Sequence, residues 1–182
     1  MACSADAGFD SPTIPRIEAD FLPGRLRVSA GALADYRTLA RFHYLAAAPA
    51  TCCRVWAARF APFGGGAGRL VGVVVLSWPS ALHAVRHRVF GLTPMRYGQR
   101  LRWVNANLRT ISRVVVHPQF RSLGLAGALI RTALAGCPTR YVETSARMAQ
   151  AHPMFARAGM IRATDDDPSR PAYFHFDRQL SR

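Results

Sequence analysis

One segment constrains the fold of this chain more than any other. Thr110–Val116 is a β-branched run that ends at His117-Pro118, and Leu123–Gly136 follows it with apolar residues at helical spacing. A short glycine-containing loop, Arg121–Ala126, joins the two patterns. Where a strand turns tightly into a helix, the first amides of the helix lack acceptors within it and bind anions. The segment therefore predicts a sheet covered by a helix, with an anion site at their junction.

The remaining patterns predict a single α/β (α+β) domain. Alternating or β-branched runs predict strands at Arg25–Ser29, Cys52–Phe60, Arg69–Trp78, Thr139–Ser145, Met160–Ala163 and Ala172–Phe176. The second and third of these flank a glycine-rich turn and form a predicted antiparallel hairpin. Helical spacing recurs over 33–44, and His152-Pro153 opens a short helix that ends at Gly159. Residues 80–107 are expected to be irregular and helical in part.

Length and composition set the domain count and the compartment. The chain has 182 residues, which predicts one domain over 25–182 preceded by a disordered arm over 1–24. Its longest apolar stretch, Leu70–Trp78, is far shorter than the roughly 20 residues that span a bilayer. The four cysteines lack the paired spacing of a zinc site. We therefore expect a cytoplasmic protein with no membrane segment and no metal.

Charge is distributed unevenly along the chain. All 24 basic residues are arginine, and between Tyr36 and Thr164 eighteen arginines accompany a single carboxylate, Glu143. The other acidic residues lie toward the two ends. Because a strongly positive potential attracts polyanions, the composition predicts either a cofactor with several phosphates or a nucleic acid as partner.

The segment Ile111–Ile130, ISRVVVHPQFRSLGLAGALI, resembles the signature of the GCN5-related N-acetyltransferase (GNAT) superfamily. In that superfamily a strand with an apolar-x-Val-x-Pro ending leads into an Arg-x-x-Gly-x-Gly/Ala loop, matched here by Arg121–Ala126. The order of elements agrees over Arg25–Phe176. The resemblance implies a mixed, mostly antiparallel central sheet with helices on both faces. It also implies one pair of parallel strands that splays apart at the cofactor site.

Two narrower resemblances accompany this one. Leu108–Val114 and His152–Phe155 are similar to an acetyltransferase-like domain associated with ABC-type ATPases. Phe42–Tyr44 and Ser112-Arg113 show a more distant similarity to phage Mom-type DNA-modification proteins.

The implied cofactor is acetyl coenzyme A (acetyl-CoA). The resemblance assigns its pyrophosphate to the loop residues Arg121, Ser122, Leu123, Gly124, Leu125 and Ala126. It assigns the thioester to the amides of Val115 and Val116, on the strand before the loop. Phe155 lies where the family has a short helix beside the pantetheine arm. Many members place a tyrosine there as general acid, and a phenylalanine cannot donate a proton.

The resemblance also implies catalytic residues. Glu143 is the expected general base, and the alternative is a structural salt bridge to Arg113, Arg140 or Arg147. His43 and Tyr44 end the first predicted helix, which borders the acceptor cleft in this fold, and their alternative is packing at the helix end. The missing acid has four possible replacements, which are Ser145, Tyr44, His152 and water, and the alternative is that the thiolate leaves without assistance.

Four further residues are candidates for substrate binding. Arg113 and His117 begin and follow the predicted cofactor strand, and their alternatives are an exposed strand-end arginine and a turn cap. Tyr97 and Trp103 belong to the segment Arg86–Arg109, which interleaves arginines with aromatic residues. That composition suits a phosphate backbone with unpaired bases, so the segment is a candidate DNA or RNA contact, or alternatively a solvated face with aromatic anchors.

These observations lead to one principal hypothesis and two alternatives. The principal hypothesis is an N-acyltransferase that moves an acetyl group from acetyl-CoA to an amine. The first alternative is a Mom-like enzyme that modifies nucleobases on the same fold. The second is a catalytically silent module that binds coenzyme A or nucleic acid, which the phenylalanine at position 155 suggests.

Overall fold

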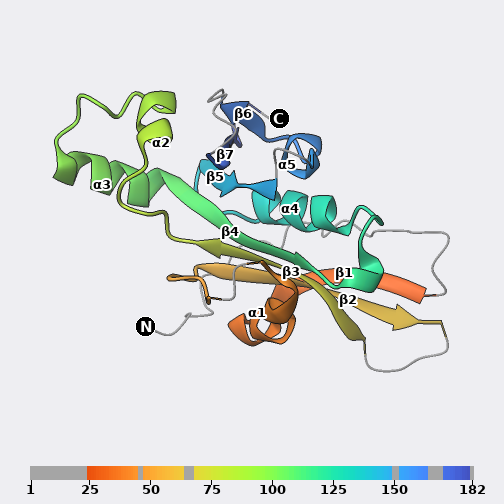
Figure 1. Cartoon of the computed structure of the whole chain (residues 1–182). Helices are drawn as coiled ribbons and strands as arrows, with labels where there is room; N and C mark the ends of the chain where they lie inside the picture. The colour runs from red at the N-terminus through yellow and green to blue at the C-terminus, as the bar shows by residue number, and fades with distance from the viewer. Residues whose placement is uncertain (1–23, 45–46, 64–67, 149–151, 164–169, 181–182) are drawn as a thin grey trace.

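The fold is known from a computed structural model of the whole chain, which describes residues 24–44, 47–63, 68–148, 152–163 and 170–180 (Figure 1). The strands are β1 (Gly24–Gly31), β2 (Arg54–Pro62), β3 (Arg69–Ser77), β4 (Leu108–Val116), β5 (Tyr141–Ala146), β6 (Ile161–Ala163) and β7 (Ala172–Asp177). The α-helices are α1 (Leu33–Leu39), α2 (Ala84–Val89), α3 (Tyr97–Asn107), α4 (Leu125–Ala135) and α5 (Met154–Arg157). Two 3-10 turns, η1 (Ala40–Phe42) and η2 (Pro118–Phe120), follow α1 and β4.

The seven strands form one mixed sheet in the order β1-β2-β3-β4-β5-β7-β6. Every neighbouring pair is antiparallel except β4 and β5, which are parallel. A parallel pair needs a crossover connection, and α4 supplies it. The predicted mixed, mostly antiparallel sheet with one parallel pair is confirmed.

Helices cover both faces of the sheet. Figure 1 shows α4 and α5 on one face and α1 on the other, while α2 and α3 extend from one end of the sheet. The face under α4 carries the larger core, in which Leu125, Leu129 and Ile130 of the helix are almost fully buried. Burying each such side chain contributes about 1.5–3 kcal/mol, so this contact fixes α4 against β3 and β4.

The helix α4 approaches the sheet closely at Gly72 of β3. A Cβ atom at this position would lie 2.9 Å from Leu129 Cδ1, closer than side chains normally pack. A larger residue here would require the Leu129 side chain to move, so glycine allows α4 to lie near the sheet with its start beside the end of β4. This placement decides the geometry of the loop between them.

The predicted elements agree with the structure except at their boundaries and in one segment. Residues 80–107 contain two helices, α2 and α3, and so are more regular than expected. The strand expected at Thr110 begins at Leu108, because Leu108 and Arg109 pair with the start of β5. The predicted arm at 1–24 lies outside the described residues, apart from Gly24, which begins β1.

Candidate active site

The loop from β4 to α4 has an unusual backbone. Ser122 adopts a φ of 66° and Gly124 a φ of 73°, both in the left-handed region. For a serine this conformation is uncommon and costs free energy, and such strained residues concentrate at ligand sites. Alternation between left-handed and ordinary backbone turns successive amides toward one side, as in anion-binding nests. The local backbone is thus shaped as a concave donor surface.

The amides of this loop are unused within the protein. The first hydrogen bond of α4 runs from the Ala128 amide to the Gly124 carbonyl oxygen. Residues 121–122 form a turn, and in the described part of the chain the amides of residues 124–127, at the start of α4, donate to no acceptor. A Cβ atom at Gly124 would meet nothing within 4 Å, so space lies directly over the loop. The free amides at the start of α4 therefore border a region that an anion can enter.

Arginine side chains surround the same loop. Arg121 donates from Nε to the Val116 carbonyl oxygen and from Nη2 to that of Phe42, each at 3.3 Å, which ties the loop to β4 and η1. His117, at the end of β4, lies 3.1 Å from the Arg69 guanidinium. Partial burial lowers the pKa of His117, and the charges of Arg69, Arg41 and Arg121 lower it further. The three guanidinium groups create a positive potential beside the free amides.

The parallel strands separate next to this loop. Pairing between β4 and β5 covers only Leu108–Thr110 with Tyr141–Glu143, although both strands continue. The predicted splayed pair is therefore present. The His117 amide donates to the Val71 carbonyl oxygen on β3. Because hydrogen-bonded pairs alternate along an antiparallel ladder, the Val115 amide also faces β3, whereas those of Val114 and Val116 face the gap.

This alternation changes one sequence-based expectation. Of the two amides predicted to contact the cofactor, the Val116 amide lies on the open side of β4 and the Val115 amide lies on the side of β3. Val114, which the sequence did not single out, shares the open side. The side of β4 on which the Val114 amide lies depends on the register between β4 and β3, and a local sequence pattern does not reveal that register.

Glu143 lies in a closed cluster at the point where the strands part. Arg86 of α2 donates to both carboxylate oxygens, from Nε at 2.8 Å and from Nη2 at 2.5 Å. Thr110 Oγ1 and the Tyr173 hydroxyl add hydrogen bonds of 2.7 Å each. Each oxygen thus accepts two bonds, which uses the full acceptor capacity of a carboxylate. Arg86 is completely buried and Glu143 is 3% exposed.

The environment of Tyr173 shows how strongly this cluster is desolvated. Its pKa is raised far above the ordinary value, first by burial and then by the neighbouring charge of Glu143. The salt-bridge alternative for Glu143 named Arg113, Arg140 and Arg147, but the partner is Arg86, 57 residues away in sequence. Sequence spacing does not indicate which of the 24 arginines contacts Glu143 in the fold.

Ser145 borders this cluster and has a partner that sequence analysis missed. It lies two residues beyond Glu143 on β5, past the last pair with β4, and is exposed. His83 Nε2 lies 3.0 Å from Ser145 Oγ, and the His83 ring packs 5.0 Å from that of Tyr173. His83 is also the N-cap residue of α2. Residues 80–86 therefore close over the sheet beside the gap.

Arg113 is held by main-chain and phenolic oxygens. It donates to the Tyr36 hydroxyl at 3.3 Å, to the Ser112 carbonyl oxygen at 2.7 Å and to that of Ala47 at 3.1 Å. These bonds join β4 to α1 and to the segment that follows η1. Arg113 is half-buried and shapes that side of the site.

His43 and Tyr44 follow η1, whose last residue, Phe42, bonds to Arg121 through its carbonyl oxygen. The two rings stack with centroids 4.6 Å apart, and Tyr44 is 56% exposed. Phe42 itself packs edge-on against His117 at 4.8 Å. The structure thus places the end of η1 beside the loop between β4 and α4.

Phe155 belongs to the hydrophobic core. It is 3% exposed and packs against Phe174 of β7 with ring centroids 5.6 Å apart. The short helix α5 ends as expected at Gly159, where φ is 94°. A phenylalanine in this position stabilises the contact between α5 and the sheet.

The segment Arg86–Arg109 divides into buried and exposed parts. Arg86 and Arg109 are buried, and Arg109 lies 3.5 Å over the Trp78 ring. Trp103 stacks on Tyr141 of β5 at 5.7 Å and so anchors α3 to the sheet. Tyr97 is 55% exposed at the first turn of α3. The aromatic-anchor interpretation thus describes Trp103, while Tyr97 remains available at the surface.

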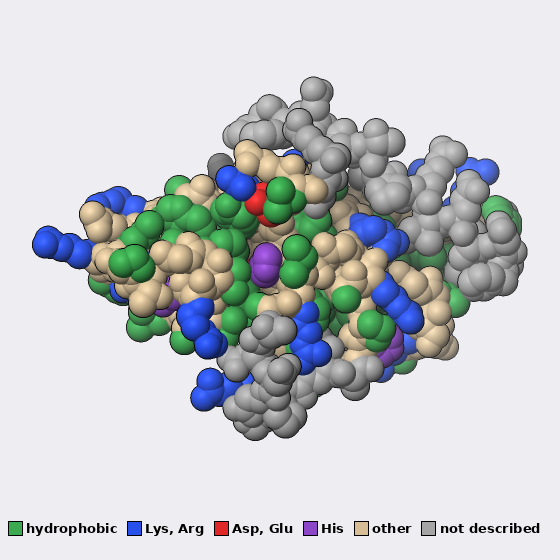
Figure 2. Space-filling model, turned by 90° about the horizontal axis from the view of Figure 1, so that it is seen from above, with side chains coloured by type: hydrophobic (Ala, Val, Ile, Leu, Met, Phe, Trp, Pro, Cys, Tyr) green, Lys and Arg blue, Asp and Glu red, His purple; other side chains and the backbone are tan. Residues whose placement is uncertain are grey.

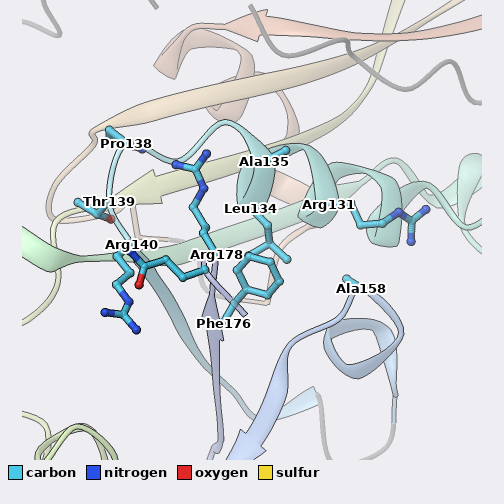
Figure 3. A pocket seen from close by; sticks show the side chains of 10 residues that line it. Arg131, Leu134, Ala135, Pro138, Thr139, Arg140, Ala158, Phe176 and Arg178 are labelled. Carbon is cyan, nitrogen blue, oxygen red and sulfur yellow. The ribbon is translucent and has the colours of Figure 1, made fainter. Parts of the chain in front are cut away.

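A second basic surface lies at the other end of α4. Figure 3 shows Arg131, Arg140 and Arg178 around a cleft of about 760 Å³ with Leu134 and Phe176 in its wall. Arg140 pairs with Asp177 at 2.7 Å, and Arg178 donates to the Cys137 carbonyl oxygen. These bonds give two of the three arginines a structural role where α4 ends. In Figure 2 arginine side chains spread over the face that carries β6 and β7, with few acidic ones.

Comparisons with known proteins decide the family. Residues 34–160 match the model of the Acetyltransferase (GNAT) family. The chain belongs to this family. The predicted GNAT membership is therefore confirmed. A search of curated proteins finds no match.

Solved structures agree with the GNAT fold. An IAA acetyltransferase from Bacillus cereus ATCC 14579 is similar with a TM-score of 0.52 and 10% identity, over 84% of this chain and 99% of the other. The KacTA–DNA complex is similar with a TM-score of 0.51 and 15% identity, over 86% and 95%. AAC(6')-Ib with paromomycin and acetyl-CoA gives 0.50 and 14%, over 86% and 95%. At these identities the likeness shows the fold alone.

GNAT membership also bears on the earlier expectations for partners. Acetyl-CoA is the cofactor of this family, as predicted, and the free amides with Gly124 fit a diphosphate. The comparisons do not support the narrower resemblances to ABC-ATPase-associated domains and Mom-type proteins.

None of the described helices is long and apolar enough to cross a membrane. The described residues also contain no group of three or more potential metal ligands.

Proposed function

We propose that this GNAT protein is an acetyl-CoA-dependent N-acetyltransferase whose acceptor is an uncharged, weakly basic amine. The observation that carries the proposal is the set of free amides over residues 124–127, at the start of α4 and next to the point where β4 and β5 separate. Together with the left-handed backbone of Ser122 and Gly124, these amides suit an anionic ligand.

The chain's own residues suit the parts of the donor. The amides of the loop, with Arg121, Arg41 and Arg69 nearby, suit the pyrophosphate. The open edge of β4 at Val114 and Val116 offers main-chain groups to the pantetheine arm, as a neighbouring strand would. When bound, acetyl-CoA supplies a thioester whose carbonyl carbon is open to attack by an amine.

The acceptor class follows from the carboxylates. In the described ranges Asp35, Glu143 and Asp177 are the acidic residues, and each is paired with an arginine. Glu143 in particular has all four acceptor positions filled. We therefore assign it a structural role and expect no carboxylate base among the residues that the structure describes, so the amine should arrive without its proton. An excess of arginine also repels alkylammonium ions, which favours aromatic or otherwise weakly basic amines.

Calorimetry with acetyl-CoA and a matched pair of variants tests the cofactor site. Gly124→Asn keeps a residue that tolerates positive φ but places a side chain in the space over the loop. Gly91→Asn is the control, since Gly91 has a φ of 63°, equally open surroundings and a position at the end of α2. Gly124→Asn should weaken acetyl-CoA binding at least tenfold, while Gly91→Asn should leave it unchanged.

Two results would contradict the proposal. Failure of the folded wild-type protein to bind acetyl-CoA at millimolar concentration would remove the cofactor site. Binding without turnover of any amine in a panel that runs from anilines to alkylamines would instead favour the silent binding module.

A nucleic-acid partner is the second candidate, supported by the arginine-rich surface and, in the segment Arg86–Arg109, by the exposed residues Arg96, Tyr97 and Arg102. Binding to DNA or RNA through phosphates predicts that log affinity falls linearly with log salt concentration. Charge-removing changes at Arg96 and Arg102 should reduce that slope. An affinity that does not respond to salt would exclude this partner.

A further inference from the structure

We propose that Ser145 is a catalytic hydrogen-bond donor of this enzyme and that His83 is its positioning residue. The inference rests on the proposed acetyl transfer and names residues for it. Ser145 would donate its hydroxyl hydrogen to the thioester oxygen as that oxygen becomes negatively charged. His83, from the segment that closes over β5, would hold the serine in the orientation that this requires.

The tautomer of His83 follows from its contacts. Its Nδ1 accepts a hydrogen bond from the Arg86 amide at 3.4 Å, which caps α2. A nitrogen that accepts a bond carries no proton in a neutral imidazole, so the proton resides on Nε2. That nitrogen lies 3.0 Å from Ser145 Oγ and therefore donates to it. The helix cap thus fixes which way the bond between His83 and Ser145 runs.

The direction of this bond leaves the Ser145 hydrogen free for another acceptor. A hydroxyl has one hydrogen and two lone pairs, and His83 occupies one lone pair. The serine lies two residues beyond the last residue of β5 that pairs with β4 and is exposed, on the same strand face as Glu143. Phe155, buried against Phe174, offers no donor. Phe174 pairs with Thr144, so Ser145 offers its hydroxyl from the opposite face of the sheet.

Burial favours the neutral form of His83. It is the main cause of the lowered pKa of this histidine, while the charge of Glu143 raises the pKa and that of Arg86 lowers it. His87, on the same helix, and Tyr173, on β7, also face this region. Because Arg86 and Glu143 neutralise each other, the pair leaves His83 beside little net charge.

The transfer step balances without a proton leaving Ser145. The amine nitrogen forms a bond to the thioester carbonyl carbon, and the carbonyl electron pair moves onto oxygen. The electron pair on oxygen then restores the carbonyl bond while the carbon–sulfur bond breaks, and the electron pair of that bond leaves with sulfur. The proton lost by nitrogen passes to that sulfur through solvent, which gives an amide and a thiol. Ser145 stabilises the negative oxygen by a hydrogen bond only.

Steady-state kinetics with acetyl-CoA and the best amine of the panel test both residues. Removing one donor from such an oxygen typically costs about a hundredfold in kcat, so we expect that loss for Ser145→Ala, with the KM for acetyl-CoA unchanged. Ser29→Ala is the matched control, an exposed strand serine on β1. His83→Asn keeps a good N-cap but is too short to reach Ser145, so it should lower kcat about tenfold.

The double variant with Ser145→Ala and His83→Asn shows whether His83 positions Ser145 or affects the fold independently of it. If His83 acts through Ser145, the double variant loses no more kcat than Ser145→Ala alone. Independent, multiplying losses would overturn the positioning role. A kcat for Ser145→Ala within twofold of wild type, in an enzyme that turns over normally, would overturn the donor role and leave the proposed function intact.

A spectroscopic measurement tests the pair without turnover. Nitrogen-15 NMR of the histidine rings should show His83 as the Nε2-protonated tautomer at pH 7, with a resonance that shifts in Ser145→Ala. An Nδ1-protonated ring would overturn the inference. Absence of acetyl-CoA binding by the wild type would overturn the inference together with the proposed function.

Discussion

Two polar regions lie on either side of the gap between β4 and β5, and they are built in opposite ways. At the start of α4, within the part of the chain that the structure describes, the amides of residues 124–127 donate to no acceptor, and Arg41, Arg69 and Arg121 lie nearby. Around Glu143, every acceptor position is filled by Arg86, Thr110 and Tyr173. Both regions are marked in the sequence by residues suited to chemistry. Only the open one has capacity left for a ligand.

The contrast shows that satisfaction of hydrogen bonds, and not residue type, separates a binding site from a structural one. A lone carboxylate in an arginine-rich chain looks catalytic until its partners are known. Buried ion pairs of this kind contribute little net stability but are costly to break, because the remaining charge has no water. The closed region should therefore respond to mutation through folding, and the open region through binding.

The largest effect is expected for Arg86→Met. It leaves Glu143 buried without its main partner and should lower the free energy of unfolding by about 3–5 kcal/mol. Urea denaturation followed by circular dichroism measures this loss. The double change Arg86→Met with Glu143→Leu should recover much of it, since no uncompensated charge remains. A double variant less stable than Arg86→Met alone would contradict this account of the closed region.

Tyr173→Phe should have an intermediate effect. It removes one of four hydrogen bonds to Glu143 and leaves the ring packing, so we expect a loss of about 1.5–3 kcal/mol in the free energy of unfolding. Thr110→Val provides a parallel measurement on the other oxygen. Acetyl-CoA affinity should be unchanged in both, and a large change in affinity would show that the two regions are not separable.

Ala126→Pro tests the open region, where we expect a change in acetyl-CoA affinity and little change in stability. Proline is tolerated in the first turn of a helix and removes an amide that α4 does not use. Losing one charge-assisted hydrogen bond of about 1.5–3 kcal/mol should weaken acetyl-CoA binding roughly tenfold to a hundredfold. Ala126→Ser, which keeps the amide, is the control. Unchanged affinity in the proline variant would exclude this amide from the cofactor site.

The smallest expected effect is a dependence of stability on pH at the edge of the closed region. The folded-state pKa of His83 is lowered from 6.5, chiefly by burial. As the pH falls, the unfolded chain therefore takes up a proton first, so the stabilisation is complete above about pH 6.5 and is lost below it. Thermal unfolding between pH 5 and 8 should show this loss, and His83→Asn should reduce it.

The sequence was sufficient for the fold where local patterns decide structure. The alternation of Arg69–Trp78, the β-branched run before His117 and the apolar face of α4 each follow from periodicity, and the GNAT signature ordered them. The boundaries of β4 could not be predicted, because its first residues become strand only by pairing with β5.

The site was less predictable because its decisive features are non-local. Nothing near Arg86 distinguishes it from the other arginines, and its pairing with Glu143 depends on how α2 packs over β5. The side of β4 that Val114, Val115 and Val116 present depends on the register with β3. His83 gave no sequence signal, since a histidine before a short helix is unremarkable until Ser145 lies beside it.

The brief contact between β4 and β5 has a thermodynamic consequence. Only three residue pairs join the β1–β4 part of the sheet to the β5–β7–β6 part, and just beyond them Thr144 Oγ1 of β5 still donates to the Ile111 carbonyl oxygen of β4. A ligand beside Val114 and Val116, further along β4, would supply contacts that a longer β5 would have made. Binding of the donor should therefore stabilise the contact between the two parts of the sheet. The free energy of unfolding should rise with the concentration of the donor.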